Sequence, residues 1–155
     1  MSAYPMVTPV DASGNIIGAS GSPSSVAVSN SPTVFTVPQP PATLFSEAAQ
    51  SRTTSGTTTS QTWTNNVSQA IIGVNVTGFA GGTNLVVSVQ QQDANGQWQT
   101  IGSSATLTAT GTANFSVGPG TTNGAVLISG GSYRLAWTLT GSFTTLTFQL
   151  SVQGR

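Results

Sequence analysis

The sequence predicts an all-β protein, in which an antiparallel β-sandwich or jelly-roll-like domain follows an extended N-terminal arm. Three observations lead to this prediction. From Gln61 onward, short runs that alternate apolar and polar residues are separated by Gly-rich turns, as in antiparallel β domains. No segment has the periodicity of about 3.6 residues that marks a long helix. Residues 1–41 contain seven of the eight prolines and little sustained periodicity.

Residues 1–41 are predicted to form an attachment arm. Residues 6–10 and 15–18 are expected to form a small hairpin around the turn at 11–14, and residues 25–28 alternate like an edge strand. Fragments of this length cannot bury a hydrophobic core alone, so their apolar side chains are expected to contact a partner. The candidate contact residues of the arm are Tyr4, Val7, Val10, Ile16, Ile17, Val26, Val28 and Phe35.

Residues 42–60, ATLFSEAAQSRTTSGTTTS, are predicted to connect the arm to the domain. One helical turn is expected around residues 45–50. The Thr/Ser/Gly-rich stretch that follows is typical of a loop.

Residues 61–155 are predicted to form the β-sandwich domain, because apolar residues recur there with the period of two that places them on one face of a strand. The expected strands are 61–65, 70–77, 84–92, 97–102, 105–110, 113–117, 125–129, 132–140 and 143–153. The expected core consists of Ile72, Val74, Val76, Leu85, Val87, Val89, Ile101, Phe115, Val117, Leu127, Leu135, Trp137, Leu146, Phe148, Leu150 and Val152.

The stretch 133–152, YRLAWTLTGSFTTLTFQLSV, is expected to form a tight hairpin. Gly141 and Ser142 suit a two-residue type II′ turn, which would set Thr140 opposite Phe143. The opposed pairs on the apolar face would then be Trp137 with Leu146, Leu135 with Phe148 and Tyr133 with Leu150.

Charge is nearly absent from the chain. Charged residues make up 4% of the sequence and the formal net charge is +0, against about 25% charged residues in ordinary soluble domains. Nothing therefore steers the protein toward nucleic acid or an anionic membrane, and neither is an expected partner. A near-neutral surface favours association, which suits a component of an assembly. The alternative is a soluble surface hydrated through its hydroxyl and amide groups.

The residue types needed for most enzyme chemistry are missing. His, Cys and Lys do not occur, which excludes a Ser-His-Asp triad and thiolate or imidazole metal ligands. Of the three carboxylates, Asp11 and Asp93 lie in turn sequences, and Glu47 has no obvious carboxylate partner. The turn at Asp93 lacks the later carboxylates of a calcium loop. We therefore expect no enzymatic activity, no catalytic residues, no cofactor and no metal site.

Trp98 is the strongest candidate for ligand contact. A three-residue loop at 94–96 would pair Gln92 with Trp98 and turn the indole away from the core. Beside Gln90 and Gln92, it would form a platform on which a sugar ring could stack. The alternatives are a bulge that turns the indole inward and packing beneath the arm. Trp63, near the start of its strand, is expected in the core.

Residues 84–153 resemble small β-sandwich virion proteins of tailed bacteriophages. The segment NLVVSVQQQDANGQWQTI is followed by a Gly-punctuated pair of strands and then by GGSYRLAWTLTGSFTTLTFQLSV. The opening VTPVDASGNIIGASGSPSSVAVS is similar to the N-terminal arms with which such proteins attach to a particle.

The resemblance implies a structural virion protein, most of all a capsid decoration or cement protein bound at the particle surface after assembly in the host cytoplasm. Its implied partners are the major capsid protein or other virion proteins. A homo-oligomer, with a trimer as the expected form, is also implied. The alternative is a carbohydrate- or receptor-binding module of a head fibre or tail that uses an exposed Trp98.

Overall fold

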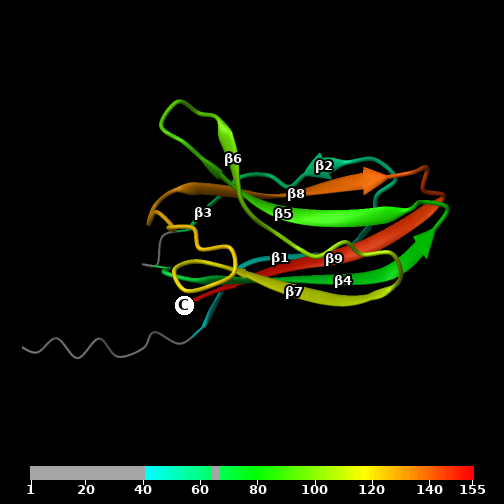
Figure 1. Cartoon of the computed structure of the whole chain (residues 1–155), viewed down its shortest axis with the longest axis horizontal. Helices are drawn as coiled ribbons and strands as arrows, with labels where there is room; N and C mark the ends of the chain where they lie inside the picture. Colours follow the sequence, from blue (N-terminus) through cyan, green and yellow to red (C-terminus); the bar gives the residue numbers. More distant parts are fainter. Residues whose placement is uncertain (1–40, 64–66) are drawn as a thin grey trace, which may run out of the picture. The chain divides into compact units, whose positions relative to one another are not determined.

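A computed structural model describes residues 41–63 and 67–155 of the chain. The predicted arm and its eight candidate contact residues lie outside the described residues, apart from Pro41. In the described part of the chain, nine strands form two antiparallel sheets that pack face to face (Figure 1). The strands are β1 (Ala42–Ser51), β2 (Gly56–Thr57), β3 (Gln61–Thr62), β4 (Ala70–Ala80), β5 (Asn84–Gln92), β6 (Trp98–Ser103), β7 (Gly111–Val117), β8 (Ser132–Thr140) and β9 (Thr145–Gly154).

The prediction of an all-β sandwich is confirmed. The first sheet has the strand order β1-β9-β4-β7, and the second has the order β2-β8-β5-β6, with β3 also paired to β8. None of the described residues belongs to a helix long and apolar enough to cross a membrane.

The core lies between the two sheets and follows the predicted period of two. Along β4, for example, Ile72, Val74 and Val76 are buried while the residues between them face outward. Twelve of the sixteen predicted core residues are buried, and Ile101, Phe115, Leu127 and Trp137 are partly buried against them. Alternation therefore predicted the inward faces of the strands correctly.

The predicted hairpin at 133–152 is wrong in its pairing. β8 pairs with β5, whereas β9 pairs with β1 and β4, so the two strands face each other across the core. Phe143 does not begin a strand. It is buried in the connection and packs edge-on against Phe79, with ring centroids 5.1 Å apart. The connection between β8 and β9 thus contributes a buried aromatic side chain to the core.

The predicted helical turn at 45–50 is also wrong, because the structure places strand β1 there. β1 pairs with β9 from Ala42 to Ser51, and the predicted connector 42–60 thus contains two strands, β1 and β2. Two register shifts interrupt β1, after Thr43 and after Glu47. Pairing with β9 overrides the weak local helix preference of this segment.

Two further predicted strands are not formed. In 105–110, only Leu107 makes a bridge, to Leu85, and before it Ser104 Oγ accepts the Val87 N–H of β5. Residues 125–129 are irregular, and their backbone is held by a side chain instead of a neighbouring strand: the Tyr133 hydroxyl donates to the Ile128 carbonyl at 3.0 Å and accepts from its N–H at 2.6 Å.

Trp63 and Tyr133 form an aromatic stack at one end of the core, as expected for a buried Trp63. Their ring centroids lie 4.0 Å apart and their planes differ by 9°. Both side chains are buried. The stack therefore joins the short β3 edge to β8, and the Tyr133 hydroxyl extends it to the loop at Ile128.

The thermal midpoint should be almost constant between about pH 5 and 9, because no His is present and few groups titrate there. Burial raises the pKa of Tyr133 above its usual 10.0, against the opposing effect of its hydrogen bond to Ile128. The folded state then holds this proton more tightly than the unfolded state, so stability is intact below about pH 10 and falls as the pH rises further. Thermal melts across this range measure the effect.

The control for this prediction is Tyr133→Phe, which keeps the ring and removes the ionisable hydroxyl. It should cost about 1–2 kcal/mol at neutral pH, because the Ile128 backbone loses a partner. Its stability should then fall less above pH 10 than that of the wild type. A steep loss of wild-type stability between about pH 5 and 8 would contradict the prediction.

Candidate functional site

The predicted contact residues Trp98, Gln90 and Gln92 lie together on the outer face of the second sheet. Gln92 pairs with Trp98, as predicted from the three-residue loop. A register shift after Val89 leaves Ile101 as the extra residue on β6 and sets Gln90 opposite Thr100. Trp98 is partly exposed and faces away from the core.

Most polar groups around Trp98 are already bonded within the protein. The Arg134 guanidinium lies 4.2 Å from the Trp98 ring centroid and thus covers one face of the indole. Arg134 Nε donates to Gln90 Oε1 at 2.8 Å, and Gln90 Nε2 donates to Thr100 Oγ1 at 3.4 Å. Gln92 Nε2 donates to the Gly96 carbonyl at 3.0 Å. The Trp98 platform stays a prediction, and a sugar would have to displace these contacts.

Asp93 organises the turn that carries this cluster. Its Oδ1 accepts the backbone N–H groups of Gln97 and Asn95 at 2.8 and 2.9 Å, and its Oδ2 accepts from Gln99 Nε2 at 3.4 Å. The Gln97 backbone N–H is the main reason that the pKa of Asp93 lies below its usual value. Within the described ranges no three His, Cys, Asp or Glu residues come together as metal ligands.

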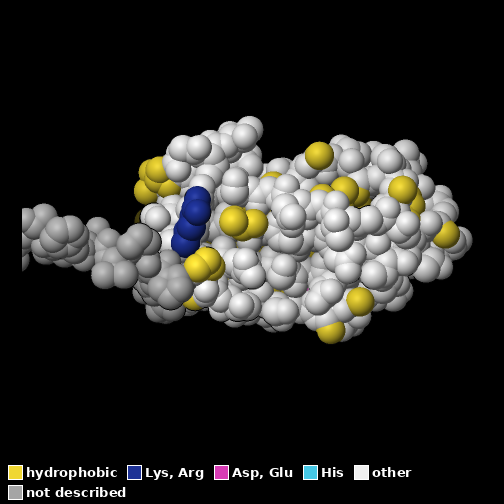
Figure 2. Space-filling view, turned by 90° about the horizontal axis from the view of Figure 1, so that it is seen from below, with side chains coloured by type: hydrophobic (Ala, Val, Ile, Leu, Met, Phe, Trp, Pro, Cys, Tyr) yellow, Lys and Arg dark blue, Asp and Glu magenta, His cyan; other side chains and the backbone are white. Residues whose placement is uncertain are grey.

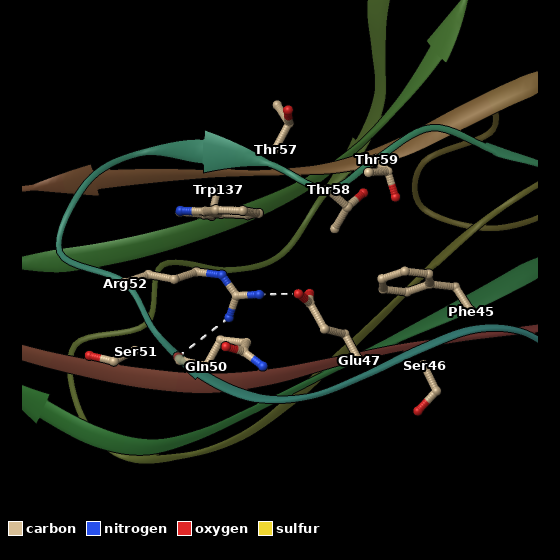
Figure 3. Close-up of a pocket in the computed structure, with 10 residues that line it drawn as sticks. All are labelled: Phe45, Ser46, Glu47, Gln50, Ser51, Arg52, Thr57, Thr58, Thr59 and Trp137. Atoms are coloured by element: carbon tan, nitrogen blue, oxygen red, sulfur yellow. Dashed lines mark hydrogen bonds and ion pairs between the residues drawn. The ribbon is translucent and has the colours of Figure 1, made fainter.

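A cleft opens along the side of the sandwich between β1 and β2 (Figure 3). Its volume is about 450 Å³. Ten residues line the cleft: Phe45, Ser46, Glu47, Gln50, Ser51, Arg52, Thr57, Thr58, Thr59 and Trp137. Hydroxyl and amide groups make up most of the lining, and one ion pair lies inside it.

Arg52 closes the sandwich at this cleft. Its guanidinium carbon lies 4.6 Å from the Trp137 ring centroid and 4.4 Å from that of Phe148, so the cation contacts an aromatic ring of each sheet. Arg52 Nη2 lies 2.6 Å from Glu47 Oε2, and Nη1 donates to the Phe148 carbonyl at 3.0 Å. The Arg52 side chain is 9% exposed.

The loop that follows Arg52 is fastened to the second sheet. Trp137 Nε1 donates to the Thr54 carbonyl at 2.9 Å, and the Leu139 N–H donates to Ser55 Oγ at 2.9 Å. Arg52 and this loop together form what we call the Arg52 clasp: Glu47, Arg52, Thr54, Trp137 and Phe148. The Arg52 guanidinium, the Glu47 carboxylate and the two aromatic rings contact one another within the clasp. Its geometry therefore supports a structural role.

Sequence reasoning did not identify the clasp. It treated Glu47 as a carboxylate without a carboxylate partner and did not consider Arg52 beside it. The available signal was their proximity, since two of the chain's six charged residues lie within six positions of each other. The stacking of Arg52 between β8 and β9 depends on contacts distant in sequence and gave no local signal.

Comparisons of the chain with protein-family models, with curated proteins and with solved structures found no significant match.

Proposed function

We propose that this protein is a structural component of a virion, most of all a decoration or cement protein. It attaches to a capsid surface through both its N-terminal arm and the uncharged surface of its sandwich, and it associates with copies of itself. The resemblance of residues 84–153 to small bacteriophage virion proteins supports the class. The neutral surface of the sandwich supports the mode of action, which is adhesion through uncharged contacts. Its partners would be the major capsid protein or other virion proteins.

Five of the six charged residues lie in the described part of the chain, and all five are engaged there. Glu47 and Arg52 form the clasp, Asp93 holds its turn and Arg134 covers Trp98. Arg155 Nε donates to Gln69 Oε1. A partner that covers the sheet faces would therefore desolvate hydroxyl and amide groups but few charges, which avoids the main cost of burying a polar surface.

The observation that carries the proposal is an exposed apolar pair in the loop between β7 and β8. Val126 is 73% exposed and Ile128 is 56% exposed. Ala70 pairs with both Val117, at the end of β7, and Gly154, at the end of β9. The loop therefore begins at the end of the sandwich where β1 starts and β9 ends. Exposed apolar groups beside a neutral surface are suited to contact another protein.

The variant Val126→Ser/Ile128→Ser tests this surface by co-sedimentation with virus particles that lack their native copy. Burying each side chain contributes about 1.5 kcal/mol or more, so the double variant should bind at least about 100-fold more weakly. Wild-type binding should change little from about 0.1 to 1 M salt, because no charge cluster contributes. Val86→Ser, on the outer face of the second sheet, is the control and should bind normally. If the double variant sedimented as the wild type does, or if moderate salt released the wild-type protein from the particles, the proposed attachment surface would be wrong.

A further inference from the structure

The outer face of the first sheet has a hollow over β4, between β9 and the edge strand β7. It measures about 310 Å³, near the lower end of the range of about 300–1,000 Å³ for ligand pockets. The hollow exists because Gly73 on β4 has no side chain between Ser151 on β9 and Asn114 on β7, its two cross-strand neighbours. The residues that line it are Gly73, Val74, Asn75, Thr112, Asn114, Gln149 and Ser151.

The side chains around the hollow come from three adjacent strands in register. Gly73 lies between Ser151 and Asn114, and Asn75 lies between Gln149 and Thr112 in the next row. Viewed from this side, most of the described surface consists of backbone and uncharged polar side chains (Figure 2). β4 and β9 are the two central strands of the sheet and β7 is its edge strand, so backbone pairing fixes the positions of the residues around the hollow.

The polar groups of this ring are free, which distinguishes them from those around Trp98. Among the described residues, the side chains of Asn75, Asn114, Gln149, Thr112 and Ser151 have no hydrogen-bond partner. Three amides each offer donors and an acceptor, and two hydroxyls offer both. A ligand therefore meets up to five unengaged side chains here, whereas at Trp98 it would first have to break internal bonds.

The chemistry of the ring selects a neutral ligand rich in hydroxyl groups. No charged side chain lines the hollow, so a phosphate or carboxylate would find no counter-charge. Each sugar hydroxyl both donates and accepts, which matches the mixed capacity of amide and hydroxyl side chains. Ile71, two residues before Gly73 on the same face, is 41% exposed and offers an apolar surface to the C–H groups of a sugar ring.

We propose that the Gly73 hollow is a binding site for neutral carbohydrate. The site uses Asn75, Asn114 and Gln149 as the main hydrogen-bonding groups and Ile71 as an apolar contact. It lies on the sheet face opposite to the Trp98 cluster. The proposal is independent of how the chain attaches to a particle. It assigns a ligand to the outer face of the first sheet.

The full chain, produced in bacteria, is applied to an array of neutral and acidic oligosaccharides, and the neutral glycan with the strongest signal is then titrated in solution by NMR. A bacterial host is needed because Asn75 and Asn114 both lie in Asn-X-Ser/Thr sequences. We expect selective binding of neutral glycans. Asn75→Ala/Asn114→Ala should weaken it at least about tenfold.

Gly73→Val gives a second test that a loss of folding cannot imitate. A Cβ at this position would meet Ser151 Oγ at 2.6 Å and Asn114 Oδ1 at 3.4 Å, both at the ends of side chains that can rotate away. Valine favours a strand more than glycine does, so the thermal midpoint should be equal or higher. The side chain fills the floor of the hollow, and glycan binding should be lost.

Trp98→Ala is the matched control and should bind the glycan as the wild type does. Loss of binding in Trp98→Ala with retention in Asn75→Ala/Asn114→Ala would overturn the proposal and place the site on the other sheet. Binding of acidic glycans alone, or of none, would also overturn it. So would unchanged binding by a folded Gly73→Val protein.

Discussion

Replacing Arg52 by alanine should lower the free energy of unfolding by about 3 kcal/mol, measured by urea denaturation followed through tryptophan fluorescence. Removing one partner of a buried ion pair costs about 3–5 kcal/mol. The lower end applies because Glu47 remains 31% exposed and can be hydrated. The substitution also removes the cation from between Trp137 and Phe148. In the wild type this cation joins the two sheets at their open side.

Arg134→Ala is the matched control, because Arg134 also lies over a tryptophan ring and donates to a neighbouring side chain. It does so on the outer face of a sheet, where such a contact contributes about 0.5–1 kcal/mol. Glu47→Gln should also cost less than Arg52→Ala, because Arg52 keeps its aromatic and carbonyl contacts. Equal losses in Arg52→Ala and Arg134→Ala would show that burial between the sheets adds nothing.

The faces of the strands were predictable from the sequence because a period of two depends only on neighbouring residues. Leu135 and Phe148 were placed on inward faces, and both are buried. The same pattern does not say which strands pair. Two strands with apolar faces can lie side by side in one sheet or face each other across a core. Gly141 and Ser142 favoured the first arrangement, whereas the structure has the second, with Phe143 buried in the connection.

β1 was missed for a different physical reason. Its register shifts after Thr43 and Glu47 break the alternation that marks a strand, so Leu44 and Phe45 are both partly buried. The segment is a strand only because β9 provides the backbone partners. The Arg52 clasp depends on the same long-range pairing and could not be predicted from local sequence.

The candidate contact residues show the same limit. The loop at Asp93 predicted correctly that Trp98 pairs with Gln92, because turn length sets the register of a hairpin. The contact between Arg134 and Trp98 crosses to a third strand, β8, and had no counterpart in the turn sequence. The Gly73 hollow likewise requires β7 and β9 on either side of β4, an arrangement that only the topology provides.

Removing residues 1–40 should leave the sandwich folded and abolish attachment to particles, whereas removing residues 1–60 should prevent folding. β1 begins at Ala42, so the shorter deletion leaves every described strand in place. Its thermal midpoint should stay within about 5 °C of that of the full chain, a change of about 1 kcal/mol or less. Thermal melts and co-sedimentation with particles measure the two effects.

The longer deletion begins the chain at Gln61, the domain boundary expected from the sequence. It therefore tests whether the domain folds without β1 and β2, which the structure includes in the sandwich. It removes β1 and β2, makes β9 an edge strand paired only with β4, and takes away Arg52 from between Trp137 and Phe148. The combined loss should exceed about 5 kcal/mol, which is comparable to the whole stability of a small domain. A cooperative melt of residues 61–155 would show that β1 is dispensable. Full sedimentation of residues 41–155 would place attachment on the sandwich alone, and unfolding of that chain would make residues 1–40 part of its core.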